Sequence, residues 1–362
     1  MRSYFEHTES GIITNSEISR NTIGRFGEIS SYYTDNFDAK TVWYDAIQYN
    51  DHVQLICPKL RNFEGEIRQG KFLINDEKVK KVEIKKYKRT DIISIKFTEP
   101  IHNIKFISPK ININSKVNQC NFSIAKNKNC AMILNKDNDL NWLSFFSKWH
   151  VKYHKLECLF ILDNGSTKYS NFDVEKALQN SGLESLFIVN LPFHFGPARL
   201  GKKIKNKELF LQTSAYNILR LRFLRNARAV LCCDIDELVR PQDINIYDYT
   251  VNSKMGFIKF LGENRYHNFN LEKELSHKSS FYKMDNKNCR PKWCINPQGK
   301  LKNYIWSTHS LENLFLDKFY ITQKYSFIHC VNVTTGWKGS REENSDNLFV
   351  DLSTKTLLQS IK

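Results

Sequence analysis

The sequence predicts an α/β protein: a mostly parallel sheet with helices on both faces, preceded by a smaller β-rich unit. Three observations support this prediction. Apolar strand patterns alternate with helical patterns from about residue 128 onward, the first third of the chain has only short strand-like segments, and polar clusters directly follow two apolar strands. Strands that alternate with helices at this spacing favour a parallel sheet. We therefore divide the chain into residues 1–125 and 126–362.

Residues 1–125 are predicted to form short antiparallel strands whose role the sequence does not specify. The segments are rich in β-branched or aromatic residues and are separated by turn residues such as Asn75-Asp76. They are Thr41–Trp43, His52–Cys57, Lys71–Ile74, Lys78–Lys86 and Ile92–Phe97. The basic run Lys78–Arg89 is interpreted either as a half-exposed strand or as a contact for a polyanion or a membrane surface.

In residues 126–362, each predicted element follows from an apolar run or from helical spacing. Leu140, Leu143 and Phe146 recur at helical intervals, with Asp137 or Asp139 as the N-cap. The predicted strands are Cys130–Leu134, Glu157–Leu162, 184–191, Ala229–Cys233 and Gly256–Leu261, and the predicted helices are 140–154, 172–180 and 207–225.

Composition excludes a disordered chain and narrows the classes of binding partner. Hydrophobic residues make up 41% of the sequence, with only 14 Gly and 8 Pro, so a substantial core is expected. Lys and Arg exceed Asp and Glu by 54 to 38, and a net charge of +16 attracts polyanions. Nine cysteines without zinc or disulfide spacing predict buried free thiols. With neither a signal peptide nor a long apolar stretch evident, cytoplasm is the expected location.

The sharpest motif is Asp234-Ile235-Asp236, which follows the apolar strand Ala229–Cys233. Alternate side chains of an extended segment point the same way, so Asp234 and Asp236 can face one ligand. Carboxylate oxygens suit Mg²⁺ or Mn²⁺ that bridges a diphosphate. The competing interpretation is a surface turn with two aspartates.

A second polar cluster, Asp163-Asn164-Gly165-Ser166, ends the strand Glu157–Leu162. A carboxylate here can accept hydrogen bonds from ribose hydroxyls or a base N–H, while Gly165 permits a tight turn. The alternative is an Asx-turn that leads into the next helix. Both clusters are expected at the carboxyl ends of strands, where α/β sheets bind ligands.

The segments LFILDNGST and AVLCCDIDELVRP, with the preceding strand and helix, resemble nucleotide-diphospho-sugar glycosyltransferases of the GT-A fold. The resemblance covers about residues 128–340 and is closest to bacterial family 2-like and family 92-like enzymes. It implies that Asp163, Asn164 and Ser166 bind the nucleotide and that Asp234 and Asp236 bind ribose and a divalent cation. The turn Asn135–Asn138 departs from the family pattern, but Asn135 is kept as a nucleotide-binding candidate.

Two later segments extend the resemblance. RPKWCINPQGKLKNYIWSTHS implies that Lys292, with Arg290 as the alternative, offsets phosphate charge and that His309 is the third metal ligand. FIHCVNVTTGWKGSREE resembles the terminal stretch of the family, with His329, Lys338 and Ser340 approximately in register. For His309 and His329 a structural role is the alternative.

An inverting reaction, which only the resemblance implies, requires a carboxylate that deprotonates the acceptor hydroxyl. Glu263, placed after the strand Gly256–Leu261, is the candidate base, with Asp285 and Glu312 behind it. The basic segment Lys202–Lys207 is interpreted as a solvated loop or as a contact for an anionic acceptor.

The expected function is transfer of a sugar from a nucleotide-sugar donor, UDP-linked, to a glycan or lipid-linked acceptor in surface polysaccharide or lipooligosaccharide synthesis. Work at the inner face of the membrane, in peripheral contact with anionic lipid, fits the basic charge. A nucleic-acid-binding protein is the alternative from another class, although no recognised module appears and no nucleic acid is expected. A metal-dependent nucleotidyltransferase is the third, but the turn after the first strand lacks glycine.

Overall fold

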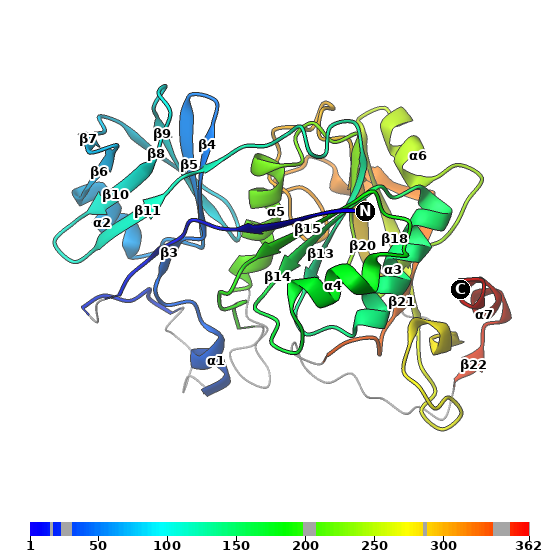
Figure 1. Ribbon diagram of the computed structural model, residues 1–362. Helices are drawn as coiled ribbons and strands as arrows, with labels where there is room; N and C mark the ends of the chain where they lie inside the picture. Colours follow the sequence, from blue (N-terminus) through cyan, green and yellow to red (C-terminus); the bar gives the residue numbers. More distant parts are fainter. Residues whose placement is uncertain (15–16, 23–30, 198–207, 285–287, 336–347, 362) are drawn as a thin grey trace.

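The computed structural model describes residues 1–14, 17–22, 31–197, 208–284, 288–335 and 348–361. Its largest feature is a nine-stranded sheet in the order β1-β15-β14-β13-β16-β20-β18-β21-β17 (Figure 1). These strands are β1 Arg2–His7, β13 Asn129–Asn135, β14 Cys158–Asp163, β15 Ser185–Asn190, β16 Ala229–Cys232, β17 Glu237–Val239, β18 Phe257–Arg265, β20 Asn288–Ile295 and β21 Ile321–Cys330. Neighbouring strands are parallel from β1 to β16 and again between β18 and β21, which confirms the mostly parallel sheet.

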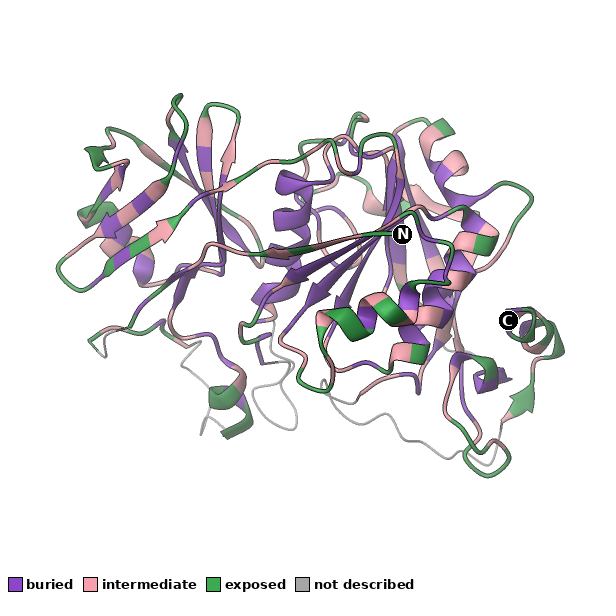
Figure 2. Ribbon diagram, viewed as in Figure 1, coloured by how far each residue is buried: buried purple, intermediate pink, exposed green. Residues whose placement is uncertain are grey.

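Helices cover both faces of this sheet, as expected. On one face, α3 (Leu140–His154), α4 (Asn171–Leu178) and α6 (Ile246–Asn252) pack over a buried cluster that includes Ala131 and Ile133 of β13. On the other face, α5 (Phe210–Arg222) packs over a cluster that includes Cys130 and Met132. Because adjacent residues of a strand point to opposite faces, β13 contributes to both clusters. Figure 2 shows these central strands as buried along most of their length.

Helix α3 has the bounds that the sequence predicts, because its start and its end are both fixed locally. The side chain of Asp139 accepts a hydrogen bond from the Asn141 backbone N–H, so Asp139, of the two candidates, is the N-cap. The helix ends at His154, and the C-cap Lys155 has a left-handed φ of 58°. Between these ends, Leu143, Phe146 and Trp149 are buried at helical spacing.

Most predicted strands of the sheet are correct to within one or two residues, but β18 is longer than expected. It runs to Arg265, beyond the predicted end at Leu261, so Glu263 lies within the strand and not after it. Polar residues extend this strand because β20 and β21 pair with it on both sides. Helix α5 is shorter than the predicted 207–225, and residue 207 lies outside the described residues.

The first third of the chain contains the predicted β-rich unit, with two small sheets around a core of its own. The five-stranded sheet has the order β12-β4-β5-β9-β8 and the four-stranded sheet has the order β11-β10-β6-β7. Their strands are β4 Asp45–Tyr49, β5 His52–Cys57, β6 Lys71–Ile74, β7 Glu77–Lys78, β8 Val82–Lys86, β9 Asp91–Lys96, β10 Asn103–Ile107, β11 Asn112–Lys116 and β12 Asn118–Gln119. The predicted strand Lys78–Lys86 is therefore divided into β7 and β8, and β8 is a half-exposed edge strand.

The remaining elements are short. They are the strand pairs β2 Gly11–Ile12 with β3 Thr41–Trp43 and β19 Tyr282–Lys283 with β22 Phe349–Val350, the helices α1 Ser31–Asn36, α2 Phe63–Gln69 and α7 Leu352–Gln359, and the 3₁₀ turns η1 His277–Ser279 and η2 Asp317–Tyr320.

The N-terminal segment joins the large sheet and not the β-rich unit. Strand β1 pairs in parallel with β15, with Arg2 opposite Ser185 and His7 opposite Asn190. A division at residue 125 therefore separates β1 from its own sheet. The local pattern of a six-residue strand does not reveal which sheet it joins, so the sequence could not show this pairing.

The β-rich unit packs against α5, which lies between that unit and the large sheet (Figure 1). The buried guanidinium of Arg222 on α5 pairs with Asp45 of β4 at 3.3 Å and with Glu6 of β1 at 2.9 Å. Both regions therefore share a packed and ion-paired interface.

Two further expectations concern the whole chain. All nine cysteines are free and seven of them are buried, which confirms the predicted thiols. Among the described helices, none combines the length and the apolar character needed to cross a membrane.

Candidate functional site

The candidate site lies at the edge of the large sheet where the strand order reverses. From β13 the chain moves to β14 and β15 on one side, and later returns to β16 on the other. Ligands of α/β sheets bind at such a switch point, outside the carboxyl ends of the strands. Asn135 ends β13, Asp163 ends β14 and Asp234 follows β16, so the structure places both predicted polar clusters at this edge.

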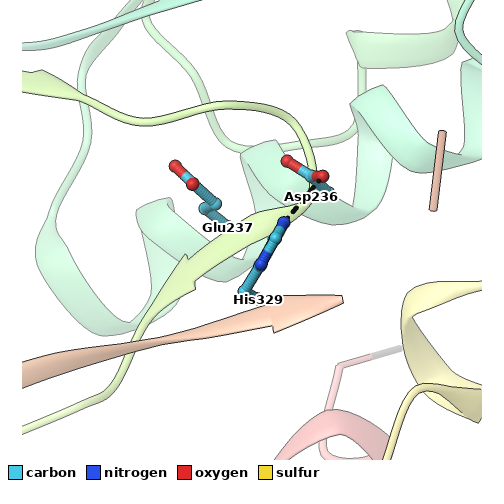
Figure 3. Close-up of side chains that lie close together, drawn as sticks. All are labelled: Asp236, Glu237 and His329. Carbon is cyan, nitrogen blue, oxygen red and sulfur yellow. Dashed lines mark hydrogen bonds and ion pairs between the residues drawn. The ribbon is translucent and has the colours of Figure 1, made fainter. Parts of the chain in front are cut away.

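Three side chains next to the switch point offer a set of metal ligands. Asp236, Glu237 and His329 each present an oxygen or nitrogen atom, and these atoms lie within 4.8 Å of one another (Figure 3). They meet because β17 and β21 pair in antiparallel register, with Glu237 opposite His329. His329 Nε2 lies 3.2 Å from Asp236 Oδ2.

His329 carries a positive charge that Asp236 stabilises. Burial alone would lower the pKa of His329, but the Asp236 carboxylate outweighs burial and raises this pKa to about 10. Both ring nitrogens then carry protons, so Nε2–H faces Asp236 and Nδ1–H donates to Asn264 Oδ1 at 2.9 Å. The Cys289 thiol donates to the same Asn264 oxygen at 2.6 Å.

Lys292 balances the negative charges of Asp234 and Glu237. Its buried Nζ lies 2.7 Å from Asp234 Oδ2 and 3.0 Å from Glu237 Oε2. Burial raises the pKa of Glu237 to about 7, and nearby Asp234 and Asp236 add to this increase while Lys292 opposes it. Burial also opposes the charge of Lys292, yet the two carboxylates hold the pKa of this lysine well above its ordinary value.

The second polar cluster forms a closed hydrogen-bond network around the end of β14. Asp163 accepts hydrogen bonds from the Ser166 backbone N–H at 2.8 Å, from the Ser166 hydroxyl at 2.6 Å and from Asn135 Nδ2 at 2.7 Å. Asn164 Nδ2 donates to the carbonyls of Leu191 and Phe193. The Ser166 N–H lies three residues after Asp163, whereas the Asx-turn that the sequence left as an alternative bonds the N–H two residues on. The next helix, α4, has its own N-cap at Ser170.

A cavity of about 390 Å³ opens over the metal-ligand group. His309 also faces this cavity, and its Nδ1 lies 3.1 Å from the Pro291 carbonyl. Burial, together with the charge of Lys292, lowers the pKa of His309 to about 4, so its ring is neutral. The cavity is lined by Arg89, Leu209, Gln212, Asp234, Asp236, Glu237, Asn264, Cys289, Arg290, Thr308, His309 and His329.

The structure brings most of the predicted site residues together, but not all of them. Glu263 is absent from this cavity wall, and its carboxylate pairs with Arg240 at 2.9 Å and Arg265 at 2.8 Å. Its pKa is lowered because these two arginines outweigh its partial burial. The predictions for Asp285, Lys338, Ser340 and the segment 202–207 lie outside the described residues.

Several residues of the cavity escaped the sequence analysis as site residues. Pairing of strands or packing of the β-rich unit brings three of these residues to the cavity wall from distant segments: Asn264, Cys289 and Arg89. No local sequence pattern identifies them as site residues. His329 was named in the sequence analysis as a candidate with a structural alternative, but not as the metal ligand, and its place after apolar Phe327 and Ile328 near the end of a strand is the usable signal. The acidic Glu237, next to the aspartate motif, had one too.

No family model matches the chain, and no curated protein matches it significantly. Solved structures that match are distant. The galactosyltransferase LgtC, in complex with donor and acceptor sugar analogues, has 19% identity and a TM-score of 0.28, covering 49% of this chain and 60% of its own. GalNAc-T7 with UDP, GalNAc and Mn²⁺ has 9% identity and a TM-score of 0.34, covering 65% of this chain and 48% of its own.

The mannosyltransferase Ktr4p from S. cerevisiae, in complex with GDP, has 12% identity and a TM-score of 0.24, covering 40% of this chain and 42% of its own. The matched part of the chain thus spans at most 60% of the length of these three structures. At such TM-scores, function has to be inferred from the sheet and the side chains of this chain.

Proposed function

We propose that this chain is a metal-dependent glycosyltransferase that takes a sugar from a nucleotide-sugar donor. The observation that carries this proposal is the meeting of Asp236 and His329, with Asp234 close by, under a cavity at the switch point of the sheet. The strand order supplies the place, and the acidic and imidazole side chains supply the chemistry for a cation and a diphosphate.

The donor set fits Mn²⁺ or Mg²⁺. Asp236 offers a carboxylate oxygen, His329 offers a ring nitrogen once it has lost its proton, and Asp234 adds a second carboxylate at the cavity wall. We assign the nitrogen ligand to His329 in place of His309, because His329 and not His309 belongs to the close group. When bound, the cation offsets the negative charge of the departing nucleoside diphosphate.

The network around Asp163 is the proposed nucleotide site. Asn164 Oδ1 is buried and has no hydrogen-bond partner among the described residues. Among the described residues, Asp163 Oδ1 accepts only the Ser166 N–H, so a lone pair remains for a base or ribose donor. Asn135 and Ser166 hold the carboxylate in place, and UDP is the proposed nucleotide.

The acceptor is proposed to be a glycan or a lipid-linked glycan, and transfer is proposed to invert the anomeric centre. Inversion requires a carboxylate at the acceptor hydroxyl. Of the three predicted candidates, Glu312 lines a second cavity next to the first, whereas Glu263 is held by two arginines. We therefore move the proposed base from Glu263 to Glu312.

Peripheral contact with an anionic membrane surface at the inner face is part of the proposal. Phe315, Leu316 and Phe319 have exposed fractions of 77%, 53% and 81%. Lys318 is exposed among them, and an apolar group beside a cation suits a headgroup layer. The protein should co-sediment with phosphatidylglycerol vesicles, and Phe319→Ser should reduce the bound fraction. Equal binding to neutral vesicles would contradict a contribution of charge to membrane binding.

A panel of nucleotide sugars, each with Mn²⁺ or EDTA, tests the function by thermal shift and product analysis. The expected result is one donor that raises the melting temperature only with metal and that releases a nucleoside diphosphate when an acceptor is added. Release of pyrophosphate would instead indicate a nucleotidyltransferase. Salt-sensitive retention of RNA or DNA without any nucleotide-sugar binding would favour the nucleic-acid alternative.

A further inference from the structure

The turn between β8 and β9 of the β-rich unit is fixed against the main domain. The Thr90 hydroxyl accepts a hydrogen bond from Ser214 of α5 at 3.0 Å. The Lys88 backbone N–H donates to Glu312 Oε2 at 2.8 Å. These two anchors flank Arg89, so the position of its backbone is set by contacts on both sides.

Arg89 lines two cavities that share a wall. One is the cavity over Asp236 and His329, and the other, also about 390 Å³, lies next to it. The residues common to both are Arg89, Arg290, Thr308 and His309. The β-rich unit thus contributes a cation directly to the wall of the candidate active site.

Three side chains of this shared wall, those of Arg89, Arg290 and Thr308, lack a polar protein partner among the described residues, whereas His309 contacts the Pro291 carbonyl. Within the described part of the chain, the side chains of Arg89 and Arg290 make no hydrogen bond and no ion pair. Thr308 is 7% exposed, and its hydroxyl has no partner there either. Burial lowers the pKa of Arg89, and the neighbouring charge of Arg290 lowers it further, although Glu312 opposes both. Two adjacent guanidinium groups and a buried hydroxyl without partners form a site for an anion.

The carboxylates of the second cavity do not cancel this charge. Asp317 forms an ion pair with Lys259 and accepts a hydrogen bond from Ser310. Of the carboxylates that line the second cavity, only Glu312 then remains to offset the positive charges of Lys88, Arg89 and Arg290. The net charge of the cavity wall is therefore positive.

The position of the shared wall points to the acceptor and not to the nucleotide. The network around Asp163 lies on β13 and β14, on one side of β16, whereas Arg290 lies on β20, on the other side. Asp234, which directly follows β16, therefore has the Asp163 network on one side and Arg290 on the other.

We propose that Arg89 and Arg290 bind a phosphate or carboxylate group of the acceptor, so that the β-rich unit completes the acceptor site. This proposal rests on the proposed glycosyl transfer, and it predicts that neutral sugars are poor acceptors. Guanidinium groups recognise both anions through paired N–H donors, so the chemistry is shared and the source is decided by experiment.

The test measures binding of glucose, glucose 6-phosphate and glucuronate to the full chain with UDP and Mn²⁺ by calorimetry. The wild-type chain should bind one or both anionic sugars more tightly than glucose, and the tighter of the two identifies the anion. Arg89→Gln should weaken that binding about tenfold or more, as expected for loss of a charge-assisted hydrogen bond. Lys81→Gln, which removes an exposed cation of the same basic run, is the matched control and should change nothing.

Three outcomes would overturn the proposal. They are equal binding of glucose and both anions by the wild-type chain, unchanged binding in Arg89→Gln, and an equal loss of UDP and Mn²⁺ binding in that variant, which would assign Arg89 to the donor. If the wild-type chain binds no UDP with Mn²⁺, the proposed function fails. If anionic sugars still bind in that case, and the binding depends on Arg89, the proposed anion site is supported independently of the proposed function.

Discussion

The carboxyl ends of β14 and β16 carry similar sequence signals but differ physically. At the end of β14, Asp163 is held by two neutral donors, Ser166 of its own turn and Asn135 at the end of β13. After β16, Asp234 and Asp236 are balanced by the cations Lys292 and His329 beside a cavity. The neutral network fixes the position of the Asp163 carboxylate. At the second end, a bound cation can take the place of the proton that gives His329 its charge. The second end is therefore the one suited to metal chemistry.

The largest effect on stability is expected when Lys292 is replaced by Met. The buried ammonium is the partner of both Asp234 and Glu237, so its loss leaves two acidic groups close together without compensation. We expect the free energy of unfolding to fall by about 3–5 kcal/mol. Urea denaturation measures this loss, and Mn²⁺ should restore part of it by occupying the acidic cluster. A loss below 1 kcal/mol would show that Lys292 does not balance this end of the sheet.

Replacing Asp236 by Asn should reduce metal-dependent transfer at least about 100-fold, because a carboxylate ligand is lost. The fold should remain, since the side chain keeps its size and a polar oxygen. Initial rates at increasing Mn²⁺ concentrations measure the effect. Asp243→Asn is the control, because Asp243 is an exposed aspartate whose side chain pairs with Lys324 away from the cavity. Full activity of Asp236→Asn would contradict the metal assignment.

The end of β14 should respond differently. Ser166→Ala removes the hydroxyl that donates to Asp163 and also accepts the Asp137 backbone N–H. We expect stability to fall by about 1–3 kcal/mol and UDP to bind more weakly, with the Mn²⁺ dependence unchanged. Calorimetric titration separates the two ligands, and a changed Mn²⁺ affinity would mean that the two strand ends act as one unit.

The smallest expected effect concerns buried neutral histidines, in contrast to His329. Burial lowers the pKa of His154 to about 4, while its Nε2 lies 2.9 Å from the Val239 carbonyl. Between pH 6.5 and 4 the unfolded chain binds a proton that the folded chain does not, so His154 makes stability fall as pH falls. His154→Gln should reduce this dependence by roughly 1 kcal/mol per pH unit. Urea denaturation from pH 7 to 5 measures it, and identical pH profiles would contradict the expected proton uptake.

Local signals account for the parts of the fold that the sequence predicted. Leu143, Phe146 and Trp149 repeat at helical spacing after Asp139, so both the face and the start of α3 were visible. The strands β13, β14 and β16 are continuous apolar runs, as expected for strands buried on both faces.

Pairing between segments that are distant in the sequence explains the parts of the fold and of the site that the sequence did not predict. His329 reaches Asp236 only because β21 pairs with β17, and Glu263 turns toward Arg240 and Arg265 because β18 continues between two partners. Strand β1 joins β15 across most of the first half of the chain. None of these contacts follows from neighbours in the sequence. Lys292 and His329 were therefore named as candidates, but their pairing with the motif aspartates was not predicted.

Anomalous scattering from a crystal soaked with MnCl₂ and UDP tests the central claim most directly. We expect a manganese peak within bonding distance of the Asp236 carboxylate and His329 Nε2, with the diphosphate on the cavity side. A map with no peak there, in which His329 still contacts Asp236 and Lys292 still contacts Asp234, would contradict it.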